Sequence, residues 1–305
     1  MDYYENCTLC PRECGVNRKV KKGYCRSDGR LTAARAALHM WEEPCISGKN
    51  GSGTVFFSGC GLGCIYCQNR EISKGNTGLE ITSERLAEIF LELQDKKANN
   101  INLVTPTHFV PHIKDAIDIA KKQNLKIPIL YNSSGYEKVE TLKMLDGYVD
   151  IYLPDFKYID RKTAKEYSNA ADYPEFAKSA VAEMVRQRGR AKFSNNGIMT
   201  SGVIIRHLLL PGRVNEAKKI VKYLFETYGD TVYISLMNQY TPIKQVENDS
   251  LLRRRVTEKE YEELIDYAVD TGVENGFIQE GGTASESFIP QFDCTGIKTK
   301  EGIDT

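Results

Sequence analysis

The chain has 305 residues, with 41 basic and 41 acidic side chains and a hydrophobic content of 41%. This size is sufficient for one sizeable hydrophobic core, so we expect one main domain. The balanced charge gives no general attraction to nucleic acid or to an anionic membrane. No apolar segment follows Met1, and no stretch approaches the roughly 20 apolar residues that span a bilayer. We therefore expect a cytoplasmic protein.

Eight of the nine cysteines lie in the first 67 residues. The cytosol keeps thiols reduced, so metal or redox chemistry explains them better than a disulfide framework does. Residues 1–50 combine clustered cysteines with many basic residues, and only 31–40 shows sustained apolar periodicity. We predict a cysteine-rich N-terminal cap over 1–50, a main domain over 51–290 and a C-terminal tail over 291–305.

From Thr54 onward, short apolar runs rich in β-formers alternate with amphipathic helical stretches. Strands are predicted at Gly53–Ser58, Ile101–Thr105, Ile127–Tyr131, Val149–Leu153, Val203–Leu209 and Thr231–Met237. Helices are predicted at Ser83–Lys96, Pro111–Gln123, Lys138–Leu145, Arg161–Arg188, Val214–Tyr228 and Thr257–Thr271. This alternation indicates an α/β fold with a parallel sheet covered by helices and wound in one sense, a partial (β/α)6 barrel.

A glycine-rich loop after the first predicted strand carries Cys60, Cys64 and Cys67 in a C-x3-C-x2-C pattern. Three thiolates on one loop can bind three corners of a cubane iron–sulfur cluster, and glycines let the backbone wrap around it. One iron then stays open for a ligand with an amine and a carboxylate, such as S-adenosylmethionine (SAM). A zinc knuckle or a group of buried thiols is the alternative. The position after a barrel strand, where barrel active sites lie, favours the iron–sulfur interpretation.

With Tyr66 directly before its third cysteine, this loop resembles the radical SAM superfamily, and more closely the homologues of pyruvate formate-lyase activating enzyme. The resemblance covers roughly residues 7–290. It implies a partial barrel of the radical SAM type, a [4Fe-4S] cluster on the three cysteines, and SAM with its adenine near Tyr66. On its own, an aromatic residue here is as consistent with ordinary packing.

Two strand ends resemble SAM-binding segments more loosely. The second predicted strand ends in Thr-Pro-Thr where the superfamily often has Gly-Gly-Glu, so Thr105 and Thr107 are proposed as replacements. The third runs into a polar stretch similar to that of the activating enzymes. The resemblance assigns Asn132 and Ser134 to the ribose or the methionine part of SAM.

The fourth and fifth strands add charged candidates. Asp155 and Lys157 resemble the Asp-x-Lys element of the activating enzymes, although a plain salt bridge is an equal alternative. Arg206 resembles an arginine that contacts SAM, and as a cation inside an apolar strand it needs a partner such as a carboxylate. Residues 238–240 follow the last predicted strand and either line the substrate end of the pocket or cap a loop. No residue is assigned a catalytic role.

Four more cysteines, Cys7, Cys10, Cys14 and Cys25, precede this domain. They are sufficient for a zinc site or a second iron–sulfur cluster, with free thiols as the alternative. Cys45 and Cys294 are isolated and are expected to be small buried hydrophobes. None of the four histidines has the spacing of a ligand pair.

The resemblance implies reductive cleavage of SAM to methionine and a 5′-deoxyadenosyl radical, with flavodoxin or ferredoxin as the electron donor. It further implies that the radical takes a hydrogen from a backbone glycine of a glycyl radical enzyme. Another peptide, an RNA or a metabolite is the alternative substrate. A non-catalytic iron–sulfur electron carrier or scaffold is an alternative of a different class, but small carriers do not need so large a repeat of βα units.

Overall fold

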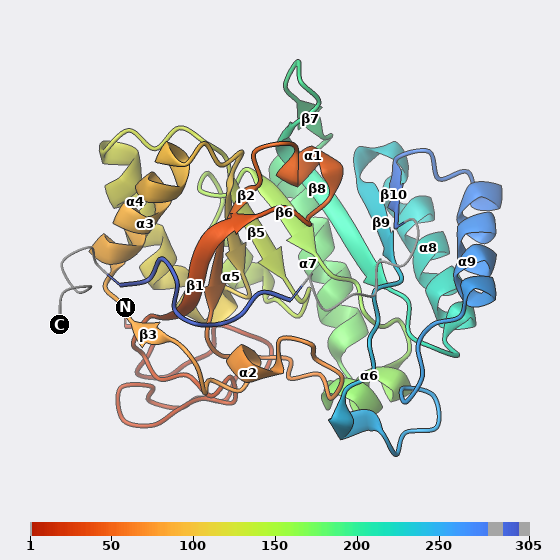
Figure 1. Ribbon diagram of the computed structural model, residues 1–305. Helices are drawn as coiled ribbons and strands as arrows, with labels where there is room; N and C mark the ends of the chain where they lie inside the picture. The colour runs from red at the N-terminus through yellow and green to blue at the C-terminus, as the bar shows by residue number, and fades with distance from the viewer. Residues whose placement is uncertain (1, 280–288, 299–305) are drawn as a thin grey trace.

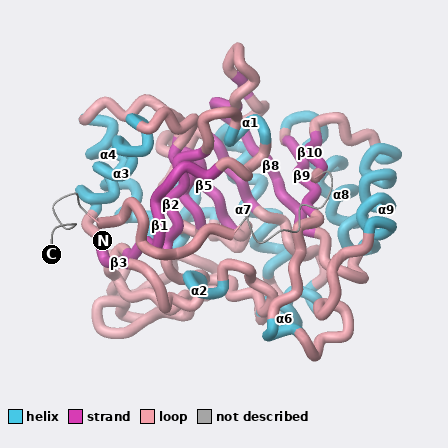
Figure 2. Tube along the Cα trace, in the orientation of Figure 1, coloured by secondary structure: helices cyan, strands magenta, loops and turns pink. Residues whose placement is uncertain are grey.

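A computed structural model describes residues 2–279 and 289–298. One sheet crosses the molecule, and most of the long helices lie at its sides (Figure 1; Figure 2). The strands are β1 (Thr32–His39), β2 (Ser52–Phe57), β3 (Leu79–Glu80), β4 (Ile101–Val104), β5 (Ile129–Ser133), β6 (Ile151–Pro154), β7 (Lys192–Phe193), β8 (Met199–Leu208), β9 (Tyr233–Met237) and β10 (Gly276–Ile278). The helices are α1 (Pro44–Ser47), α2 (Arg70–Ser73), α3 (Ser83–Asp95), α4 (Val110–Lys122), α5 (Val139–Lys143), α6 (Arg161–Ser168), α7 (Tyr173–Arg188), α8 (Val214–Tyr228) and α9 (Glu258–Thr271).

The order of the strands is β10-β9-β8-β6-β5-β4-β2-β1-β3, and β7 pairs with β8 off this path. From β10 to β2 all neighbours are parallel, whereas β1 and β3 are antiparallel additions. A helix lies in each connection between parallel strands, as parallel pairing requires. The predicted α/β fold with a mostly parallel sheet is confirmed. The six predicted strands correspond to β2, β4, β5, β6, β8 and β9, and β10 adds a short seventh parallel strand.

The single helix predicted over Arg161–Arg188 is wrong, because two helices fill this range. Asn169 ends α6 with a left-handed φ of 47°, a conformation that asparagine tolerates better than most residues. Pro174 lies in the first turn of α7, where its missing N–H costs nothing, whereas inside one continuous helix it would break a hydrogen bond. The break leaves the last carbonyls of α6 free to accept hydrogen bonds from elsewhere.

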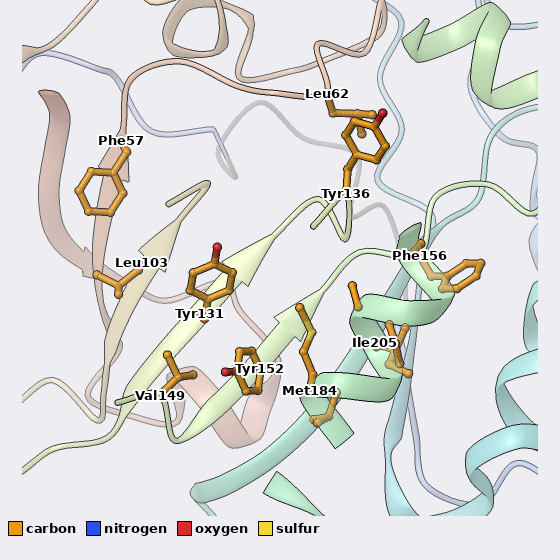
Figure 3. Packing of buried hydrophobic residues seen from close by; sticks show 14 of the residues in the cluster. Phe57, Leu62, Leu103, Tyr131, Tyr136, Val149, Tyr152, Phe156, Met184 and Ile205 are labelled. Carbon is orange, nitrogen blue, oxygen red and sulfur yellow. The ribbon is translucent and has the colours of Figure 1, made fainter. Parts of the chain in front are cut away.

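Side chains of the parallel strands alternate between two buried faces, as the two-residue period of a strand requires. On β8, Val203 and Ile205 pack into the main core under the helices, and Ile204 packs on the opposite face. Figure 3 shows part of the main core, with Tyr131 of β5 and Tyr152 of β6 in it. The opposite face, here called the inner face, carries the candidate site.

Strand β1 lies within the segment that the sequence assigned to the N-terminal cap, and its pairing with β2 attaches residues 32–39 to the sheet. The chain then turns into α1, whose Cys45 and Ile46 pack on the inner face. The described part of the C-terminal tail lies along the edge of β1 that faces away from β2. There Cys294 N–H donates to the Ala34 carbonyl (2.9 Å).

Residues 2–31 form neither helix nor strand and are organised by turns around buried Arg18. The Arg18 guanidinium donates to the backbone carbonyls of His108 (2.7 Å) and Asp28 (2.6 Å) and lies over the ring of Tyr4. A buried cation needs such partners. The cap is thereby attached to the sheet next to the end of β4.

Candidate active site

A cavity of about 320 Å³ lies on the inner face, at the carboxyl ends of the parallel strands. All three cysteines of the C-x3-C-x2-C loop line it. Most of the predicted SAM contacts also line it: Tyr66, Thr105, Asn132, Ser134, Asp155, Lys157 and Arg206. Gln239 and Tyr240 after β9 contribute as well, and Asn238 is not part of the lining.

The cysteine loop begins at Gly59, which has a left-handed φ of 95°. A Cβ at this position would lie 2.7 Å from the Cys25 carbonyl oxygen, so only glycine allows these two segments of the backbone to approach so closely. The next residue, Cys60, donates its N–H to the same carbonyl (3.1 Å). The loop therefore starts in direct contact with the N-terminal segment.

Burial raises the pKa of the Cys60 thiol and raises that of Cys67 to about 12. The neighbouring Cys64 raises both further, because negative charges that lie close together repel. Each sulfur also has a hydrogen-bond donor beside it: the Leu62 and Gly63 N–H groups at Cys60, the Ser168 hydroxyl at Cys64 and the Ser73 hydroxyl at Cys67. The loop is thus built to hold three thiolates once a positive centre offsets the cost of burial.

This donor set suits an iron–sulfur cluster better than a single metal ion. Within residues 2–279 and 289–298, no three His, Cys, Asp or Glu side chains converge where one ion could sit. The thiolates of a cubane cluster bind separate irons, and therefore stand farther apart than the ligands of one ion. Three thiols on one wall of a cavity, each with a donor, match that requirement.

Arg206 is the centre of a charged network on the inner face. Its guanidinium donates to Asp155 (2.9 Å), to Glu42 (3.1 Å) and to the Asn132 side-chain oxygen (2.7 Å). The expectation that this buried cation needs a carboxylate is confirmed. Asp155 also pairs with Lys157 (2.6 Å), so the alternative of a plain salt bridge describes part of the geometry.

Burial alone would raise the pKa of Asp155, but the adjacent Lys157 and Arg206 lower it below the ordinary value. For Lys157 the effects are reversed. Burial alone would lower its pKa, but the adjacent Asp155 raises it above the ordinary value. These groups therefore stay ionised within the cavity wall. They offer a SAM-sized ligand both signs of charge without a change of protonation.

Sequence reasoning missed the acidic pair Glu42–Glu43, which lines the cavity between β1 and α1. Glu43 is only 8% exposed, and its Oε2 atom has no hydrogen-bond partner among the described residues. Burial raises the pKa of this carboxyl group. In the sequence, two glutamates before Pro44 look like an ordinary exposed helix start. Only the pairing of β1 with β2 brings them inside.

Tyr66 packs against other aromatic rings and also lines the cavity. Ordinary packing and a position near the adenine of SAM are therefore compatible for this residue. Its ring makes edge contacts with Tyr167 and Tyr240, with centroids 6.2 and 6.1 Å away. Its hydroxyl lies 2.8 Å from that of Tyr158. The ring is therefore fixed at one wall of the cavity.

The side chains of the two threonines after β4 point in different directions, and only one of them lines the cavity. Thr105 lines the cavity with a left-handed φ of 57°, a strained conformation for a β-branched residue. Thr107 does not line the cavity, because it starts a short 3₁₀ helix that turns its side chain away, and its hydroxyl donates to buried Glu137 (2.7 Å). Glu137 also accepts a hydrogen bond from Tyr131 (3.2 Å).

Arg12, which lies between the front cysteines, joins three parts of the site. Its guanidinium donates to four backbone carbonyls: Gly61 (2.9 Å) and Leu62 (3.1 Å) in the cysteine loop, and Ser168 (2.8 Å) and Asn169 (2.5 Å) at the end of α6. The guanidinium also lies 4.0 Å from the centre of the Tyr24 ring. One side chain thus fixes the cysteine loop, the N-terminal segment and α6 relative to one another.

The front cysteines are gathered beside this loop. Burial raises the pKa of Cys10 to about 12 and also raises that of Cys25. A Cβ on Gly23 would lie 3.4 Å from the sulfur of Cys25 and 3.5 Å from that of Cys14, so both sulfurs face the same glycine. The nearby thiols of Cys25 and Cys7 add to the rise in the pKa of Cys10.

A profile of the radical SAM superfamily matches residues 54–224, which is more than half of the chain. The chain belongs to the radical SAM superfamily. Membership implies a [4Fe-4S] cluster and SAM as cofactors, and a reductant to supply the electron.

Two curated relatives are similar in sequence. The uncharacterised protein MJ0674 of Methanocaldococcus jannaschii is 28% identical over 274 residues, which cover 87% of this chain and 75% of that protein. The pyruvate formate-lyase-activating enzyme of Clostridium pasteurianum is 28% identical over 115 residues, which cover 35% of this chain and 45% of that enzyme.

The fold is shared with a solved structure. The FeFe-hydrogenase maturase HydG of Carboxydothermus hydrogenoformans superimposes with a TM-score of 0.52 at 13% identity, over 73% of this chain and 52% of that chain. This chain thus spans about half the length of that maturase. The predicted partial barrel of the radical SAM type is confirmed by the superfamily match together with this shared fold. In the described ranges, none of the helices combines the length and the apolar character needed to cross a membrane.

Glu137 generates a prediction about stability. Burial raises its pKa to about 7, so the folded state holds the proton more tightly than the unfolded chain, where the ordinary value is 4.5. This contribution to stability is complete below about pH 4.5 and is lost as the pH rises through about 7. Relative to Glu137→Gln, which stays neutral, the wild type should lose ~3 kcal/mol of unfolding free energy over that range.

Urea unfolding of both proteins between about pH 4 and about pH 8 measures this difference. Glu140→Gln, on the exposed side of the next helix, is the matched control and should follow the wild type. A difference between wild type and Glu137→Gln that stays constant with pH would show that Glu137 titrates normally.

Proposed function

We propose that Cys60, Cys64 and Cys67 hold the [4Fe-4S] cluster and that the adjoining cavity binds SAM. The observation that carries this proposal is the lining of the cavity, which joins the three thiols to the Arg206 network. When bound, the reduced cluster supplies the electron that cleaves SAM into methionine and a 5′-deoxyadenosyl radical. A cluster held by three cysteines would leave one iron open, and that iron would take the amine and carboxylate of SAM.

The residues of the wall match the remaining chemistry of SAM. Thr105, Asn132 and Ser134 offer hydroxyl and amide groups for hydrogen bonds to polar parts of the ligand. Lys157 and Arg206 offer positive charge to its carboxylate, while Tyr66 offers an aromatic face. The apolar strands around these groups keep water away from a reactive radical.

The first prediction of this proposal concerns SAM cleavage. After anaerobic reconstitution and reduction with dithionite, the wild type should form 5′-deoxyadenosine from SAM, and Cys64→Ala should form none, because its cluster lacks one ligand. Cys294→Ala is the matched control, since this half-buried cysteine lies outside the cavity, and it should keep wild-type activity. Chromatography of the products measures the result. A loaded wild type without cleavage would favour the electron-carrier or scaffold alternative.

We further propose that the radical is passed to a protein glycine, as in a glycyl-radical-enzyme activase. The similarity to the pyruvate formate-lyase-activating enzyme supports this substrate class, although it covers only 35% of the chain. The cavity adds a second argument, because the Oε2 atom of Glu43 has no hydrogen-bond partner among the described residues and is available to a polar group of the ligand. A peptide group is one such group.

This substrate class predicts a stored protein radical. The reduced wild type with SAM and a pyruvate formate-lyase should give an organic radical in electron paramagnetic resonance, in an amount that matches the 5′-deoxyadenosine formed. Cys64→Ala should give no radical. Cleavage of SAM with no radical on any of several glycyl radical enzymes would instead point to another peptide, an RNA or a metabolite as the substrate.

For the reductant we propose a flavodoxin or ferredoxin, which are small soluble one-electron donors. All nine cysteines are free of disulfides, which supports a reducing compartment such as the cytoplasm. We also propose that Cys7, Cys10, Cys14 and Cys25 hold a second metal centre, either zinc or an iron–sulfur cluster. The cluster fits better, because no three of the described Cys, His, Asp or Glu side chains converge where a single ion could sit. Cys7 and Cys25 are buried, Cys10 is half-buried and Cys14 is exposed. The Cys10 sulfur lies against Gly61 of the cysteine loop, and this gathering of thiols supports the centre.

Metal analysis of a variant without the first cluster tests the second centre. A triple variant, Cys60→Ala with Cys64→Ala and Cys67→Ala, should keep about four irons or about one zinc per chain, because the front cysteines remain. Adding Cys10→Ala should remove that metal. A triple variant that binds neither metal after reconstitution would show that the front cysteines are free thiols.

A further inference from the structure

Ser168 is the last residue of α6, more than a hundred positions after the cysteine loop, yet its side chain reaches that loop. Its hydroxyl oxygen lies 3.1 Å from the sulfur of Cys64 and is placed to donate to it. The residue is 1% exposed, so water does not compete for this contact. The same oxygen lies 2.8 Å from the hydroxyl of Tyr158.

Tyr158 extends this contact into a chain of hydroxyls. Its oxygen lies 2.8 Å from the hydroxyl of Tyr66, and both tyrosines are buried. Each hydroxyl carries one proton and can rotate to suit its neighbours. With Ser168 donating to the Cys64 sulfur, the Tyr158 hydroxyl can give its single proton either to Tyr66, as in this structure, or to Ser168. In the second arrangement Tyr158 polarises the serine O–H bond that points at the sulfur.

We propose that Ser168 is a positioning residue that donates a hydrogen bond to the Cys64 thiolate and raises the reduction potential of the cluster held there. The proposal rests on the assignment of Cys64 as a cluster ligand. Reduction adds one negative charge to a buried centre, and a donor at a ligand sulfur stabilises the more negative state. Tyr158 strengthens this donor when its proton points to Ser168, and the external reductant supplies the electron.

The backbone around Ser168 fixes this geometry. The carbonyl of Tyr167 accepts the N–H of Ile65 inside the cysteine loop (2.9 Å). The carbonyl of Ser168 itself is bound by Arg12, which also binds the carbonyls of Gly61 and Leu62. The end of α6 is therefore attached to the loop on both sides of Cys64, and the serine hydroxyl is held at its sulfur.

The test is a redox titration monitored by electron paramagnetic resonance on the reconstituted wild type and on Ser168→Ala. Ser168→Ala should bind the same amount of iron but reach half-reduction at a more negative potential. Tyr158→Phe removes only the group behind the serine and should shift the potential in the same direction by less. Tyr136→Phe is the matched control and should show no shift, because its hydroxyl bonds Asp172 outside this chain of hydroxyls.

The outcomes separate this inference from the proposed function. A wild type that loads no cluster on Cys60, Cys64 and Cys67 would overturn both. A wild type that loads the cluster and cleaves SAM, while Ser168→Ala keeps the wild-type potential, would overturn the role of Ser168 alone. If Ser168→Ala fails to keep its iron, Tyr158→Phe decides: a lower potential supports the chain of hydroxyls, and an unchanged potential overturns it.

Discussion

The carboxyl ends of the parallel strands meet along one edge of the sheet, and the candidate site depends on that arrangement. Residues that are far apart in sequence, such as Thr105, Asp155 and Arg206, reach one cavity because each lies near the carboxyl end of a strand or follows it directly. The cysteine loop follows β2 at the same edge. Each parallel strand, or the segment directly after it, contributes residues to the cavity lining, which allows a chain of short strands to surround a SAM-sized ligand.

The inner face of the sheet is polar at its centre, and its stability depends on charge compensation. Arg206 is shared between Asp155 and Glu42, and Asp155 is shared with Lys157. Loss of one member would leave its partners buried and uncompensated, which costs ~3–5 kcal/mol in comparable networks. The same network that offers charge to a ligand therefore also holds β6 and β8 to the segment before α1. Binding and folding are not separable at these positions.

Much of this arrangement could be predicted from the sequence. Apolar periodicity located the six main strands, and the spacing of Cys60, Cys64 and Cys67 indicated their chemistry, because both signals are local. The antiparallel pairing of β1 with β2 depends on contacts between distant segments and was not predicted, so Glu43 was missed with it. Thr107 was predicted to contact SAM together with Thr105, but the 3₁₀ helix that begins at Thr107 turns its side chain away from the cavity. The reach of Ser168 back to the cysteine loop has no sequence signal either.

Arg12 has a consequence for how the protein is made. Two of its four carbonyl partners lie in the cysteine loop, and the other two, at Ser168 and Asn169, are synthesised about a hundred residues later. While the ribosome is still making α6, Arg12 can bind the carbonyls of the loop but not those of Ser168 and Asn169. The N-terminal segment and the cysteine loop can therefore meet before α6 exists, and α6 is the last part to complete the four carbonyl partners of Arg12.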